Sequence, residues 1–74
     1  MLQENPDNSI PIFISDTLYD EKEELMLVLY NNGKVEEFYG VIKEMYDEYR
    51  ASFFREKYFY NNIKNVYDFY FVKY

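Results

Sequence analysis

The sequence contains no cysteine, no histidine and no tryptophan among its 74 residues. Without cysteine, no disulfide can brace the fold, and no thiolate can act as a nucleophile or bind zinc. Without histidine, the chain lacks the side chain that most often serves as a general base near neutral pH. These absences exclude thiol catalysis, histidine-dependent catalysis and metal sites built from histidine or cysteine.

Glycine and proline are also scarce, with two of each. Neither Gly33 nor Gly40 lies in a P-loop or a dinucleotide-binding motif. Hydroxyl nucleophiles are few, and none stands in a G-x-S-x-G sequence. They are Ser9, Ser15, Thr17 and Ser52. We therefore predict that the protein is not an enzyme, with no catalytic residues and no cofactor.

Acidic residues crowd positions 16–24, where oxygen atoms could serve as metal ligands. Their spacing lacks the D-x-[DN]-x-[DN]-G pattern of a calcium-binding loop. Acids are also favoured in the first turn of a helix, where the helix dipole attracts negative charge. We interpret the segment as an acidic helix start and predict no metal site.

Long apolar runs are missing. The longest, residues 25–30, is far shorter than the roughly 20 residues of a membrane-spanning helix. The N-terminus is polar and has no signal-peptide pattern. We expect a cytoplasmic protein. Residues with AT-rich codons predominate, which indicates a low-GC bacterium or one of its phages, and for a phage protein the compartment is the host cytoplasm.

Aromatic residues, in contrast, are abundant: the chain has ten tyrosines and seven phenylalanines. A buried aromatic side chain removes about 150–250 Å² from water. A domain of this size hides only about 60% of its unfolded surface. The core cannot hold every ring, so we expect some rings at the surface or in an interface, which favours a homodimer or a stable partner over a lone monomer.

The net charge of −6 is unevenly distributed. Residues 1–49 carry twelve acids and three lysines, a net −9, whereas residues 50–74 carry two acids and five bases, a net +3. Such an asymmetry bears on partners and not on the fold.

The pattern predicts a flexible lead-in over residues 1–8 and a single small domain over residues 9–74. Residues 10–14 are β-branched and contain Pro11, which is typical of an edge strand or an extended arm. Residues 66–72 have strand propensity but also fit a helical stripe, so both alternatives stay open.

Residues 21–31 are ambiguous. Asp20 and Glu23 have the spacing of a capping box, and residues 31–33 end in a glycine suited to a helix C-terminus, which favours a helix. The apolar run at residues 25–30 equally suits a buried strand, and Asn32-Gly33 is also a hairpin signal.

Residues 35–53 show the clearest periodicity. At 100° per residue, the apolar side chains fall within an arc of about 120°, which predicts a helix that ends or bends near Ser52. The arc contains Val35, Phe38, Tyr39, Ile42, Met45, Tyr46, Tyr49 and Phe53. The opposite arc contains Glu36, Glu37, Glu44, Asp47 and Glu48.

These elements predict a predominantly α fold: a small helix-rich domain with a helical hairpin and a short N-terminal extended segment. The alternative is an α+β fold with residues 24–30 and 66–72 as strands and residues 35–52 as a crossover helix. Residues 27–38 resemble the first helix and turn of helix-turn-helix domains. The acids that would face DNA disfavour nucleic-acid binding there, so the resemblance supports a helical hairpin only.

The acidic helix face is the main candidate site. Its five acids span about 18 Å, a charge spacing close to that of phosphates along one DNA strand. A face of this kind can occupy a basic nucleic-acid-binding groove, as a DNA mimic. Three acids can extend the site: Asp20, Glu23 and Glu24. Candidate aromatic anchors beside it are Tyr58, Tyr60 and Tyr67.

In size, charge and genome bias the chain is similar to small acidic phage proteins that block host defence, including anti-CRISPR proteins. Our leading hypothesis is a non-enzymatic inhibitor or adaptor that binds a protein with a basic surface, such as a nucleic-acid-binding enzyme. The alternative is a homo-oligomeric structural or regulatory subunit, antitoxin-like or virion-associated. A weaker alternative is RNA binding through the basic, aromatic residues 50–74.

Overall fold

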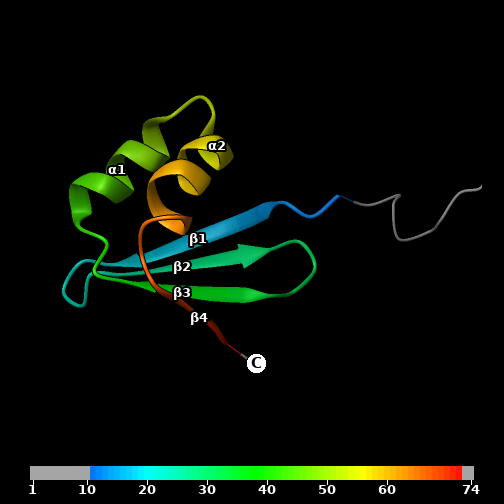
Figure 1. The fold of residues 1–74 in the computed structure, drawn as a ribbon, viewed down its shortest axis with the longest axis horizontal. Coiled ribbons are helices and arrows are strands. Elements are labelled where there is room, and N and C mark those ends of the chain that lie inside the picture. Colours follow the sequence, from blue (N-terminus) through cyan, green and yellow to red (C-terminus); the bar gives the residue numbers. More distant parts are fainter. Residues whose placement is uncertain (1–10, 73–74) are drawn as a thin grey trace, which may run out of the picture.

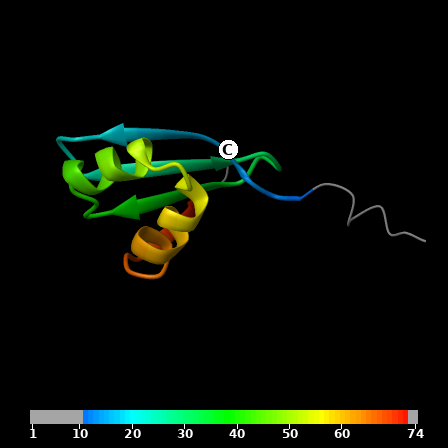
Figure 2. The same ribbon diagram turned by 90° about the horizontal axis from the view of Figure 1, so that it is seen from above.

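The computed structural model describes residues 11–72, and the predicted lead-in at residues 1–8 lies outside this range. A four-stranded antiparallel sheet has its strands side by side in sequence order, and helical segments pack on one side of it (Figures 1 and 2). The elements are β1 (Ile14–Asp20), β2 (Leu25–Tyr30), β3 (Val35–Tyr39), α1 (Lys43–Ala51), α2 (Arg55–Phe59), the π-helical η2 (Tyr60–Lys64) and β4 (Phe69–Val72). The fold is α+β, so the predicted predominantly α fold is wrong.

The predicted helix over residues 21–31 is a strand, β2, joined by turns to its neighbours. Asp20 does accept a hydrogen bond from the Glu23 backbone at 3.2 Å, but this bond lies in the β1–β2 turn. Short polar side chains make the same local bond in turns and in helix caps, which explains the error. Gly33, at φ +89°, turns the chain into a β2–β3 hairpin. The helical hairpin inferred from residues 27–38 therefore does not form.

The predicted helix over residues 35–53 is wrong in its first part. Val35–Tyr39 is β3, paired with β2 on one side and β4 on the other. The chain then turns at Gly40, with φ +87°, before α1 begins at Lys43. The crossover helix of the alternative fold is wrong for the same reason. In contrast, the strand that the alternative fold places at residues 24–30 corresponds to β2, and its strand at residues 66–72 contains β4.

The edge strand of the sheet, β1, lies later in the chain than the edge strand predicted at residues 10–14, and the two share only Ile14. Ile14 is the first residue of β1, and residue 10 lies outside the described range. Phe13 is tied to the β2–β3 turn, because its N–H donates to Asn31 Oδ1 and its carbonyl accepts from Asn31 N–H, both at 2.9 Å.

The core lies between the sheet and the helices. Paired residues across an antiparallel sheet share a face, so Tyr19, Met26, Phe38 and Phe69 form one inward row. Rings from the helices complete this layer: Tyr46 stacks on Tyr19 with centroids 4.6 Å apart, and Phe59 meets Phe38 edge-on at 5.2 Å. The buried cluster comprises Met26, Val28, Tyr30, Phe38, Val41, Tyr46, Tyr49, Phe59 and Ile63.

Within residues 11–72, no helix has both the length and the apolar character needed to cross a membrane.

Replacing Gly40 with alanine distinguishes the observed fold from a continuous helix over residues 35–52. In a helix, alanine is more favourable than glycine by about 1 kcal/mol. At a positive φ, alanine costs about 1–2 kcal/mol instead, and no neighbouring atom within 4 Å complicates the comparison. We expect Gly40→Ala to lower the free energy of unfolding by about 1 kcal/mol in a urea titration. Gly40→Asn should cost less, because asparagine tolerates this region. A stabilised Gly40→Ala variant would contradict the turn.

Candidate functional site

The five acids of the predicted helix face lie on different surfaces. Glu36 points inward from β3 and is 1% exposed. Glu37, the next residue, points to the opposite face of the sheet and accepts a 2.6 Å hydrogen bond from the Tyr39 hydroxyl. The other three are exposed on α1: Glu44, Asp47 and Glu48. A single acidic face over residues 36–48 does not form, because β3 and α1 are separate elements.

Part of the predicted acidic region does come together at one end of the molecule. The Glu24 carbonyl accepts hydrogen bonds from the Gly40 and Val41 N–H groups, which brings the β1–β2 turn beside the start of α1. Burial raises the pKa of Tyr19, as do the charges of Glu24, Glu21, Glu44 and Asp47, in order of effect. Lys43 offsets some of this charge through a 2.7 Å ion pair with Asp47. Glu23 and Asp20 are exposed in and beside the same turn.

Glu36 belongs to a buried polar cluster. Its Oε1 accepts a 2.6 Å hydrogen bond from the Tyr30 hydroxyl, and its Oε2 accepts a 2.9 Å bond from Lys64 Nζ. The Lys64 ammonium also lies 4.9 Å from the centroid of the Phe69 ring. Burial raises the pKa of Tyr30, and so does its hydrogen bond to Glu36. The cluster joins β2, β3 and η2, and it leaves Glu36 no exposed surface to offer a partner.

The three predicted aromatic anchors make contacts within the chain. The Tyr58 hydroxyl donates to Glu48 Oε1 at 2.6 Å, which ties α2 to α1. Tyr67 is half-buried and packs against the core. Tyr60 is 41% exposed, and its ring lies 5.8 Å from Lys64 Nζ.

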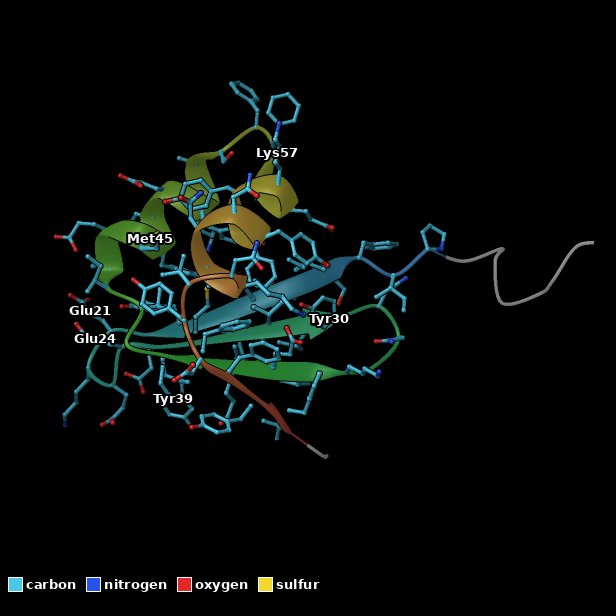
Figure 3. All side chains as sticks on the ribbon, viewed as in Figure 1. Glu21, Glu24, Tyr30, Tyr39, Met45 and Lys57 are labelled. Atoms are coloured by element: carbon cyan, nitrogen blue, oxygen red, sulfur yellow. The ribbon has the colours of Figure 1, made fainter. Side chains whose placement is uncertain are left out.

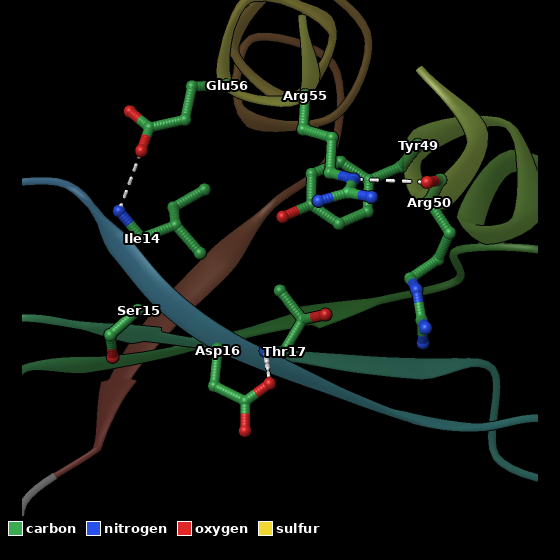
Figure 4. A pocket seen from close by; sticks show the side chains of 8 residues that line it. All are labelled: Ile14, Ser15, Asp16, Thr17, Tyr49, Arg50, Arg55 and Glu56. Carbon is green, nitrogen blue, oxygen red and sulfur yellow. Dashed lines mark hydrogen bonds between the residues drawn. The ribbon is translucent and has the colours of Figure 1, made fainter. Parts of the chain in front are cut away.

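A cavity of about 350 Å³ lies between β1 and the helices. Figure 4 shows two arginines on the helical side, Arg50 and Arg55, with Asp16 on β1. Glu56 caps the strand edge by accepting the Ile14 N–H at 2.9 Å, and Arg55 Nε donates to the Arg50 carbonyl at 3.0 Å. Strand pairing turns the Asp16 side chain toward the opposite face of the sheet, so the cavity keeps Arg50, Arg55 and Glu56, which are charges of both signs.

A second feature is the sheet face turned away from the helices, here called the open face. Strand pairing places eleven side chains on it in three rows. The rows are Asp16–Leu29–Val35–Val72, Leu18–Leu27–Glu37–Tyr70 and Asp20–Leu25–Tyr39. Leu18 is 54% exposed and Tyr70 61%. Within residues 11–72, no helix covers these rows (Figures 1 and 2), and of their eleven side chains Val35 alone is buried, at 7% exposed.

The charged residues of the open face are all acids: Asp16, Asp20 and Glu37. This face was not predicted from the sequence, although one signal for it was present. A half-exposed strand alternates apolar and polar residues, but β2 is apolar at every position, which indicates two apolar faces.

Compared with known proteins, the sequence matches no family model and no curated protein. Over residues 11–72, no three acidic side chains gather as ligands for a metal ion. On geometry, the open face is the candidate functional site.

Removing one partner of the buried cluster should destabilise the fold strongly. Lys64→Met leaves the Glu36 carboxylate buried without its cation, and such a loss typically costs about 3–5 kcal/mol. We expect the lower end, because the Lys64 side chain is 26% exposed. The double variant Glu36→Leu/Lys64→Met should recover most of the stability, because no unpaired charge remains. Equal losses in the single and double variants, measured by urea unfolding, would contradict this account.

Alkaline pH should unfold the protein as tyrosines ionise. Burial is the main reason why the pKa of Tyr58 is raised to about 12, and its hydrogen bond to Glu48 contributes as well. Burial also raises the pKa of Tyr30 and of Tyr49. A group whose pKa is higher in the folded state contributes stability that is complete below its unfolded pKa, near 10. This contribution is lost as pH rises from about 10 through 12. Thermal unfolding across this range should show a falling Tm, with a smaller fall in Tyr58→Phe. A Tm that stays constant to pH 12 would contradict these shifts.

Proposed function

We propose that this chain is a non-enzymatic protein-binding module that docks a partner on the open face of its sheet. The partner surface has an apolar centre flanked by basic side chains. One observation carries this proposal: the open face joins leucines from β1 and β2 and aromatic rings from β3 and β4, and its only charges are negative.

The apolar part of the open face supports docking. Antiparallel sheets with one solvated face normally carry polar residues there, and monomeric proteins rarely expose a large continuous apolar patch. Here Leu25, Leu27 and Leu29 are all less than fully buried in adjacent rows, with exposed Leu18 and Tyr70 beside them. Covering such side chains with a partner removes apolar surface from water at about 25 cal/mol per Å².

The charge of the open face favours a basic partner over a second copy. Face-to-face pairing of two copies would bring Asp16, Asp20 and Glu37 of each into one interface with no base on either face. Like charges juxtaposed in an interface oppose association, whereas a basic partner gains both specificity and a faster encounter. The net charge of −6 adds long-range attraction to such a partner. A basic nucleic-acid-binding groove is one surface with this character.

The open face can be tested with Leu18→Ser/Leu27→Ser, which removes two leucines from neighbouring strands. Phe53→Ser/Phe54→Ser is the matched control, because it removes two rings exposed by 99% and 73% in the α1–α2 connection. After a partner captured by the wild type is identified and purified, calorimetry gives its Kd for each variant. We expect about a tenfold or larger increase in Kd for the open-face variant and little change for the control.

The acids of α1 provide the competing outcome. If Glu44→Lys/Asp47→Lys/Glu48→Lys abolishes binding while Leu18→Ser/Leu27→Ser leaves it intact, α1 is the interface and the open-face proposal is wrong. Circular dichroism of each variant verifies the fold before binding is compared.

Self-association provides an independent test. We expect light scattering to show a monomer at micromolar concentration, because the acids of the open face repel a second copy. A dimer that persists in high salt and dissociates in Leu18→Ser/Leu27→Ser would instead support a homo-oligomeric protein, and would overturn docking of a basic partner.

A further inference from the structure

We infer that a tyrosine-lined cavity at the margin of the open face binds an arginine side chain of the docked protein. This inference rests on the proposed function, because it names the group by which a basic partner is recognised. The cavity has a volume of about 570 Å³ and is lined by Tyr39, Val66, Tyr67, Asp68 and Tyr70.

The cavity is continuous with the open face. Tyr39 ends β3 and Tyr70 lies in β4, and strand pairing places both side chains on the open face. Figure 3 shows Tyr39 at the lower side of the sheet, beside β4. A side chain reaching past the edge of a docked surface therefore enters the cavity directly. Val66 and Tyr70 are 65% and 61% exposed, so the entrance is open to solvent.

Ring geometry favours a flat cation. The rings of Tyr39 and Tyr70 meet nearly at a right angle, with an interplanar angle of 74° and centroids 5.7 Å apart. Rings at this angle form a corner, and a group placed in that corner can meet the face of a ring. A cation near a ring face is attracted by the electrons of the ring, and the planar guanidinium group also stacks against it. Tyr67 packs against the core, which holds the third ring in place.

The charges around the cavity favour a cation and disfavour an anion. Asp68 is in the lining, and Glu37, which accepts the hydrogen bond of the Tyr39 hydroxyl, adds a second carboxylate nearby. The nearest base along the chain, Lys64, is held by Glu36 at 2.9 Å. A carboxylate can accept two parallel hydrogen bonds from a guanidinium but not from an ammonium, so the cavity suits arginine better than lysine.

A pair of blocked tripeptides tests the cavity without the partner. Acetyl-Gly-Arg-Gly-amide carries the guanidinium, and the same peptide with citrulline has nearly the same shape but no charge. We expect saturable NMR shifts of the ring protons of Tyr39, Tyr67 and Tyr70 on titration of the full chain with the arginine peptide. Binding of the citrulline peptide should be weaker by about two- to fivefold or more.

Two variants locate the effect. Asp68→Asn removes the charge while preserving shape, and Tyr70→Leu removes a ring while preserving bulk. Each variant should bind the arginine peptide about two- to fivefold more weakly. Glu44→Gln on α1 is the matched control for a distant acid and should leave binding unchanged. Equal binding of the arginine and citrulline peptides, shifts confined to α1, or no saturable shift of the three tyrosines overturns the inference.

The outcomes separate this inference from the proposed function. If Leu18→Ser/Leu27→Ser weakens binding of the partner while the arginine peptide fails to bind, docking on the open face is supported and the assignment of the cavity is wrong. If the peptide binds but the leucine variant leaves the partner untouched, the cavity is a cation site and open-face docking falls.

Discussion

One buried carboxylate constrains the whole helical layer. Glu36 lies inside the fold, where an unpaired charge would cost several kcal/mol out of a total stability of about 5–15 kcal/mol. Lys64, the last residue of η2, forms the ion pair with this carboxylate. The helical segment after β3 must therefore return across that same strand before the chain enters β4. The pairing thus fixes where η2 lies, and through it the return of β4 beside β3.

The same residue explains why the predicted helix over residues 35–53 is wrong in its first part. A strand with one buried face normally shows apolar residues inward, but β3 places Glu36 inward beside Phe38. Glu36 and Glu37 therefore looked like two members of one solvated helix face. A helical projection also cannot register a change from strand to helix, and Gly40 was the only local mark of that change. The part of the predicted helix that became α1 was predictable, because it depends on local pattern alone, whereas the predicted edge strand shares only Ile14 with β1.

Other signals were correct locally but ambiguous in context. The Asp20–Glu23 bond exists, and the glycine of Asn32-Gly33 has a positive φ, yet both belong to turns between strands. Long-range pairing decides such cases, and no local motif contains it. The candidate site was not predicted, because of the acids and rings expected to form it only Asp20 and Glu37 belong to the open face. The expected surplus of aromatic residues is confirmed, since Phe53, Phe54 and Phe71 remain largely exposed.

The distribution of acids over the open face also has a consequence for colloidal behaviour. An exposed sheet rich in leucine is a surface on which chains stick to each other, and charged residues among the leucines act against such aggregation. Asp16, Asp20 and Glu37 occupy these protective positions, one in each row of the face. The carboxylates that set the charge of the docking surface thus also keep free copies apart. Solubility and selectivity are consequently coupled, because the same three carboxylates serve both.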